Sequence, residues 1–143
     1  MAGRRIVSRH NPQFAEGELA PAFAKLVQAA GQLPEIAQST WFNTPSLKVR
    51  GKSLCRVKDP DTVVLMCPLE EKDLLIAAAP DIYFETDHYK GWPAILVRID
   101  AISTAELALR LERAFAMQAP RALLRAWRNS QGISSGFLPG RLR

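Results

Sequence analysis

Histidine, cysteine and long apolar runs are scarce in this chain, and each scarcity argues against a class of protein. Its 143 residues include two histidines and two cysteines, and the cysteines lack the spacing of a metal-binding or redox pair. No Gly-rich phosphate loop, zinc-protease motif or catalytic-serine motif is present. We therefore expect no metal, no cofactor and no enzymatic activity.

The absence of long apolar runs also bears on location. No run approaches the roughly 20 residues that cross a bilayer. The basic residues 1–5 are not followed by the apolar segment of a signal peptide. Cys55 and Cys67 are expected to be free thiols, which suit a reducing compartment. These features predict a cytoplasmic protein with no membrane span.

Positive charge is abundant, but it lies mostly at the two ends. The net charge is +5, yet residues 16–117 hold eleven of the nineteen cations and all fourteen acids, which leaves that segment at −3. Overall basicity is therefore weak support for binding to nucleic acid, and only a local cluster of cations supports it.

The first half of the chain has the pattern of a helix followed by antiparallel strands. Apolar residues recur with helical spacing from Leu19 to Ala30, and Gly31 can end the helix. We expect Trp41 and Phe42 to be core side chains. The predicted strands are residues 38–42, 44–50, 53–58 and 62–67.

Residues 44–54 read as a β-hairpin with three cations near its turn. Leu47 and Val49 share one face of the strand. Gly51 supplies the positive φ that a tight turn needs, and the turn centres either on Arg50 and Gly51 or on Gly51 and Lys52. Polar side chains alternate with the apolar ones at Ser46, Lys48 and Arg50.

The second half reads as helix, two strands and helix. Pro68 opens a helix whose inner face is expected to carry Leu74, Leu75 and Ala78. Strands are expected at 82–85 and 94–99. Ser103 and Glu106 have capping-box spacing at the start of the last core helix. The apolar stripe of that helix consists of Leu107, Leu111, Ala114 and Phe115.

These patterns predict an α+β, two-layer domain of order α-β-β-β-α-β-β-α. Its antiparallel sheet of about five or six strands is covered on one face by helices. We expect residues 1–16 to be a flexible basic arm and residues 17–118 to be a single domain. Residues 119–143 are expected to form a short basic helix, up to about Asn129, and a disordered tail.

Two segments resemble a family of small bacterial proteins. They are residues 44–52 (TPSLKVRGK) and residues 88–93 (HYKGWP), the latter leading into the strand at 95–99. In this order they are similar to the MmcQ/YjbR family, and the similarity runs from about Phe23 to about Leu124. Leu47 stands where the family often carries Phe. The resemblance implies a frataxin-like, double-wing α+β fold and DNA binding through two β-hairpins.

The cations of the first hairpin are the leading candidates for contacts with DNA phosphates. Arg56 and Lys58 can extend the patch, while neighbouring acids dilute it. The alternative is a solvated strand face with no ligand. The candidate nucleic-acid-binding residues are Lys48, Arg50, Lys52, His88, Lys90, Arg121, Arg125 and Arg128.

Aromatic side chains offer a second interpretation. Trp41, Tyr89 and Trp92 can face a ligand, so the chain can also be a protein- or small-ligand-interaction module. Tyr89 and Trp92 can instead cover a sheet edge. An enzyme would require His88 to meet a carboxylate such as Asp87 or Glu85 in a cleft. The arginine face at 121–128 can also be solvated.

Overall fold

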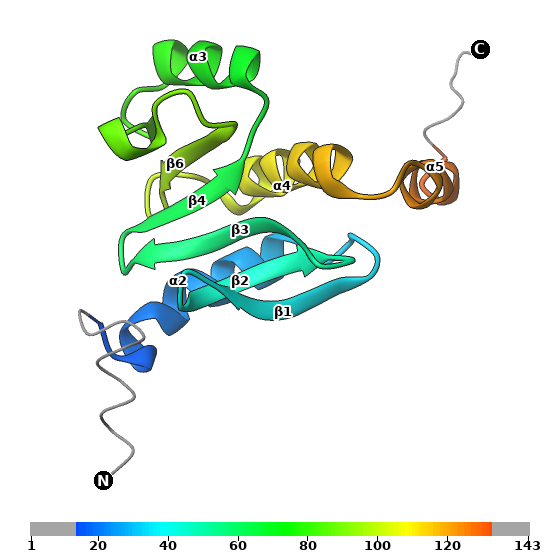
Figure 1. Cartoon of the computed structure of the whole chain (residues 1–143), viewed down its shortest axis with the longest axis horizontal. Helices are drawn as coiled ribbons and strands as arrows, with labels where there is room; N and C mark the ends of the chain where they lie inside the picture. The colour runs from blue at the N-terminus through cyan, green and yellow to red at the C-terminus, as the bar shows by residue number, and fades with distance from the viewer. Residues whose placement is uncertain (1–13, 133–143) are drawn as a thin grey trace, which may run out of the picture.

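A six-stranded antiparallel sheet with helices on one face forms the protein (Figure 1). The computed structural model describes residues 14–132. The strand order across the sheet is β1-β2-β3-β4-β6-β5, which confirms the predicted α+β class. The strands are β1 (Ile36–Trp41), β2 (Thr44–Val49), β3 (Lys52–Asp59), β4 (Thr62–Met66), β5 (Tyr83–Phe84) and β6 (Ala94–Arg98). The helices are α2 (Glu16–Ala29), α3 (Leu69–Ala78), α4 (Thr104–Gln118) and α5 (Arg121–Ser130), with a 3-10 helix, η1 (Asp87–Tyr89).

Four strands precede α3; they correspond to the four predicted strand segments, although the predicted element order counted only three. β1 and β2 are separate strands because a turn of two residues joins them. Phe42 and Asn43 in this turn have positive φ values of 53° and 64°, as a tight hairpin requires. Phe42 is 57% exposed, so the prediction that it is a core side chain was wrong.

The β2–β3 turn is centred on Arg50 and Gly51. Val49 pairs with Lys52, and the two residues between them have φ values of 49° and 85°. Both positive values belong to the primed hairpin turns. Glycine accommodates this backbone without strain, whereas Arg50 adopts it at a cost.

The core lies between the sheet and the helices α2 and α4. The alternation predicted for β2 is confirmed, since Leu47 and Val49 are buried in this layer. The helical stripe predicted for α4 is also buried there and includes Leu111 and Phe115. Burial of one such side chain stabilises the fold by about 1.5–3 kcal/mol. Within the described part of the chain, the opposite face of the sheet carries a smaller second cluster, made of Val64, Tyr89, Ala94 and Leu96.

The inner face of α3 differs from the predicted one. Leu74 is 70% exposed, and Ala78 is also exposed. The residues that face the protein are spaced i, i+3, i+4 and i+7, which is also a helical stripe. They are Lys72, Leu75, Ile76 and Ala79.

The capping box predicted for α4 forms only in part. The Ser103 side chain accepts a hydrogen bond from the Glu106 N–H at 3.0 Å. The Glu106 carboxylate, which was expected to bond back to the cap, accepts a hydrogen bond from the Tyr83 hydroxyl instead. It therefore ties α4 to the edge strand β5.

Helix α5 packs on the domain through Trp127. This indole is buried, and its Nε1 donates to the Gln32 carbonyl at 3.1 Å. Its ring meets Phe115 edge-on, with centroids 5.6 Å apart. The helix extends through Ser130, one residue beyond its predicted end. The predicted arm was residues 1–16, but α2 already begins at Glu16. Residues 1–13 of this arm and residues 133–143 of the predicted tail lie outside the described residues.

None of the described helices is long and apolar enough to cross a membrane.

Candidate functional site

The two segments that carried the sequence resemblance meet at one groove. It has a volume of about 390 Å³ and lies between the tip of the β2–β3 hairpin and the loop that precedes β6. We call it the hairpin groove. Its lining residues are Trp41, Lys48, Gly51, Lys52, Ser53, Met66, Trp92, Pro93 and Gln118.

The groove exists because β3 extends beyond the end of β4. Pairing between these strands begins at Cys55 and Leu65, so residues 52–54 have no partner in β4. Antiparallel pairing would otherwise satisfy the backbone of β3 there. The Gln118 side chain takes over one such contact, since its Nε2 donates to the Ser53 carbonyl at 2.9 Å.

Two cations line the groove without acidic neighbours. Its lining includes Lys48 and Lys52 but no carboxylate, and within residues 14–132 neither lysine forms an ion pair. Arg50, the third predicted cation, is bound to Glu35, with Nε 2.5 Å from Oε1. The pKa of the Glu35 carboxyl is lowered, mainly by this hydrogen bond. The hairpin therefore presents two uncompensated charges instead of three.

Two of the three predicted aromatic side chains line the same groove. Trp92 is 44% exposed, and Trp41 is half-buried against Phe42, with ring centroids 5.2 Å apart. Tyr89 is buried in the second cluster, so its ring is structural. His88 is exposed and stacks on Trp92 at 6.2 Å without lining the groove.

The remaining predicted residues of the 86–93 loop are placed at its surface. Lys90 is exposed and is not among the residues that line the groove. Glu85, considered as a partner of His88, forms an ion pair with Lys72 instead, with Nζ and Oε1 2.7 Å apart.

Lys72 is a residue that sequence reasoning missed. It is 1% exposed, and its Nζ donates to the carbonyls of Tyr89 and Trp92 at 2.8 and 3.0 Å. With the ion pair to Glu85, three oxygen atoms hold this ammonium group. Lys72 thereby fixes the backbone of the loop that presents Trp92. Its spacing from Leu75 and Ile76 places it on the same face of the helix as these apolar residues. This pattern could have indicated burial, but lysine is rarely fully buried.

Arg56 was predicted to extend the exposed cation patch, and this was wrong. It is 9% exposed, and its Nη2 donates to the Tyr89 hydroxyl at 2.8 Å. Its Nη1 donates to Thr44 Oγ1 at 3.1 Å, and the Phe42 ring covers it with its centroid 5.2 Å away. Arg56 therefore links β3 to the 86–93 loop.

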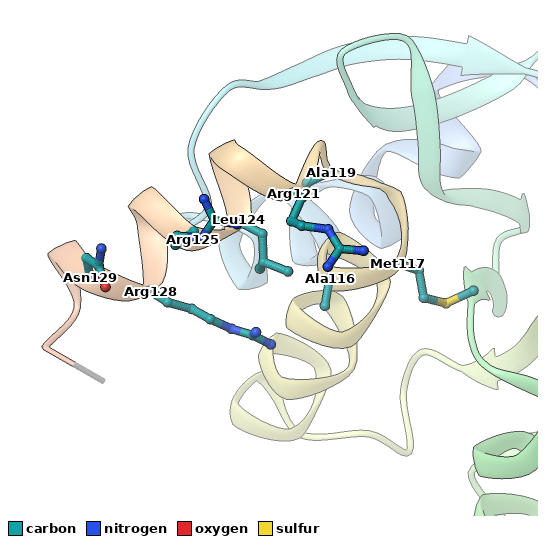
Figure 2. A pocket seen from close by; sticks show the side chains of 8 residues that line it. All are labelled: Ala116, Met117, Ala119, Arg121, Leu124, Arg125, Arg128 and Asn129. Atoms are coloured by element: carbon teal, nitrogen blue, oxygen red, sulfur yellow. The ribbon is translucent and has the colours of Figure 1, made fainter. Parts of the chain in front are cut away.

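The three predicted arginines of α5 line a second, larger hollow of about 690 Å³. We call it the arginine cleft. Arg121, Leu124 and Arg128 extend from α5 toward the end of α4 (Figure 2). Consecutive residues at the end of α4 line the two hollows, since Met117 lines the cleft and Gln118 lines the groove. The full lining is Ala116, Met117, Ala119, Arg121, Leu124, Arg125, Arg128 and Asn129.

The two cysteines are buried free thiols. Burial raises the pKa of Cys55 to about 12. Burial, together with the charge of Glu71, raises that of Cys67 to about 11. A thiolate is the reactive form of cysteine, so neither side chain is activated at neutral pH.

The acidic first turn of α3 is occupied by ion pairs. Glu71 binds Arg113 and lies 3.8 Å from Arg110 Nη1. Among residues 14–132, no cluster of three His, Cys, Asp or Glu side chains is placed to hold a metal ion.

Comparisons with known proteins identify similar chains. Residues 31–117 match the family model described as YjbR. Uncharacterized proteins of Mycobacterium tuberculosis and Mycobacterium bovis are 41% identical over 61 residues, which is 43% of this chain and 47% of each relative. The matched segment thus spans about half the length of these curated relatives.

A crystal structure of a Deinococcus radiodurans protein with a DUF419 domain has a similar fold. The TM-score is 0.56 at 20% identity, and the alignment covers 82% of this chain and 92% of that one. At this identity the likeness concerns the fold alone.

Proposed function

The chain belongs to the YjbR family, and from the surface that its two characteristic segments form we propose that it binds DNA through the hairpin groove. The observation that carries the proposal is the placement of Lys48 and Lys52 beside two indole rings, with no carboxylate in the lining. This local charge matters because residues 16–117 are net acidic.

Lysine ammonium groups at the rim of a groove favour phosphate. Each phosphate contact releases condensed counterions, which gives affinity that falls with salt. Such contacts position the nucleic acid but do not read its sequence. The proposed binding is therefore weak and largely independent of sequence.

A salt series tests this proposal. A labelled oligonucleotide is titrated with the protein, by fluorescence anisotropy, between about 20 and 200 mM salt. The logarithm of the affinity is expected to fall linearly with that of salt, with a slope of about −1.4 to −1.8 for two contacts and a steeper slope if the arginines contribute. No binding at the lowest salt would show the proposal to be wrong.

A second candidate function is an interaction module for a small aromatic anion or a protein segment. The groove volume of about 390 Å³ lies within the range of roughly 300–1,000 Å³ of small-ligand sites. The two tryptophans favour this reading, whereas the burial of Tyr89 reduces the aromatic surface. If the groove is a small-ligand site, a mononucleotide should bind about as tightly as a longer oligonucleotide.

A further inference from the structure

We propose that the DNA is bound as a single strand. Its bases stack on the indoles of the hairpin groove while its backbone continues past the end of α4 into the arginine cleft. This inference rests on the proposed function and specifies the form of its ligand.

The hairpin is poorly shaped for entering a duplex. A two-stranded ribbon fits the major groove, which is about 12 Å wide. Here β1 pairs with β2 along its whole length, from Trp41 with Thr44 to Ile36 with Val49. The tip is therefore flanked by a third strand up to its last residue, and the sheet is too broad there to act as a free ribbon.

The groove is lined by two indoles, of which Trp92 has the His88 ring on one side and Trp41 has the Phe42 ring beside it. Trp92 is 44% exposed, although an indole gains much by burial. Its backbone is fixed through its carbonyl by the buried Lys72, so the ring stands on a rigid platform. Bases within a duplex are already stacked on each other, whereas an unpaired base can stack on an aromatic side chain.

The arginine cleft supplies a continuation for the backbone. Arg121, Arg125 and Arg128 lie on one helical face and form no ion pair within residues 14–132. The adjacent residues Met117 and Gln118 line the cleft and the groove respectively. Both hollows thus touch the C-terminal end of α4, where the proposed strand passes from the indoles to the arginines.

The test compares three probes at about 50 mM salt: a fifteen-nucleotide oligothymidylate, a duplex of fifteen base pairs, and thymidine monophosphate. The single strand is expected to bind at least about ten-fold more tightly than the duplex. Loss of stacking on one base in Trp92→Ala should lower single-strand affinity by about 5- to 150-fold. Trp92→Phe should retain most of it, and Leu74→Ala, which alters an exposed residue on α3, should change nothing.

The arginine arm of the test uses Arg121→Gln/Arg125→Gln/Arg128→Gln. This variant should lower the salt slope for the oligothymidylate by about 1 to 2 and leave the binding of thymidine monophosphate unchanged. Equal affinity for single strand and duplex, with no effect of Trp92→Ala, would overturn this inference and leave the proposed function standing. Mononucleotide binding as tight as that of the oligomer would rule out the strand path. Failure of every nucleic-acid probe to bind would refute the proposed function itself.

Discussion

The double substitution Lys48→Glu/Lys52→Glu is expected to lower the affinity for DNA by about 100-fold or more at about 50 mM salt. Each phosphate contact contributes about 0.7 (single strand) to 0.9 (duplex) to the slope of log affinity against log salt, so losing two contacts lowers the affinity by about 60- to 200-fold at this salt concentration. Charge reversal adds repulsion in a groove that otherwise holds no carboxylate. Anisotropy titration measures the effect, and circular dichroism verifies the fold.

A matched control lies on the same strand. Lys58→Glu makes the same charge change at the opposite end of β3, outside the groove lining. Lys58→Glu should reduce the affinity of the unmodified protein by less than about three-fold at about 150 mM salt, because distant charges are screened. Lys52→Glu alone should reduce it by more. If the two single substitutions weaken binding equally, the effect is one of net charge and the groove is not the site.

The largest expected effect on stability is that of Lys72→Met. Removal of one partner from a buried ion pair costs about 3–5 kcal/mol. Here it also leaves the carbonyls of Tyr89 and Trp92 without their hydrogen-bond donor. Chemical unfolding followed by circular dichroism should show a decrease of this size in the free energy of unfolding.

Two controls isolate the contribution of the buried ammonium group. Lys52→Met removes an exposed lysine and should change stability by less than about 0.5 kcal/mol. Lys72→Met/Glu85→Gln should regain part of the loss, because no carboxylate is then left unpaired. A cost below about 1 kcal/mol for Lys72→Met would contradict the role assigned to this contact.

Sequence patterns correctly predicted those parts of the fold that interactions between nearby residues determine. The alternation of Leu47 and Val49 placed the core face of β2 correctly, because side chains of a strand point to opposite faces in turn. Gly51 marked the hairpin turn, since it adopts positive φ without strain. The apolar stripe that includes Leu111 correctly predicted which face of α4 packs on the sheet, because residues three or four apart lie on the same side of a helix.

Residues whose environment depends on distant segments were the ones misplaced. Arg56 is buried because Tyr89 and Thr44, which are distant in sequence, supply its acceptors. Leu74 was expected inside, yet α3 turns Lys72 inward toward carbonyls of the 86–93 loop. These partners lie too far away in the sequence to be seen in a short segment. Helical periodicity therefore favoured the apolar Leu74 over the charged Lys72 as the inward-facing residue.

The candidate site combines both kinds of information. Its two segments were recognised in the sequence, but their convergence follows from sheet order, in which β4 separates β3 from β6. The short pairing of β3 with β4 then leaves space between residues 52–54 and Trp92. The pairing of Arg50 with Glu35 could not be read from the hairpin alone.

Indole N–H signals in nuclear magnetic resonance test the central claim most directly. The chain has three tryptophans, of which Trp41 and Trp92 line the groove, while Trp127 is buried and bonded to Gln32. On titration with a three-nucleotide oligothymidylate, the signals of Trp41 and Trp92 should shift in proportion to saturation, with that of Trp127 as a nearly stationary internal control. Binding that leaves both groove signals unmoved would contradict the proposed site.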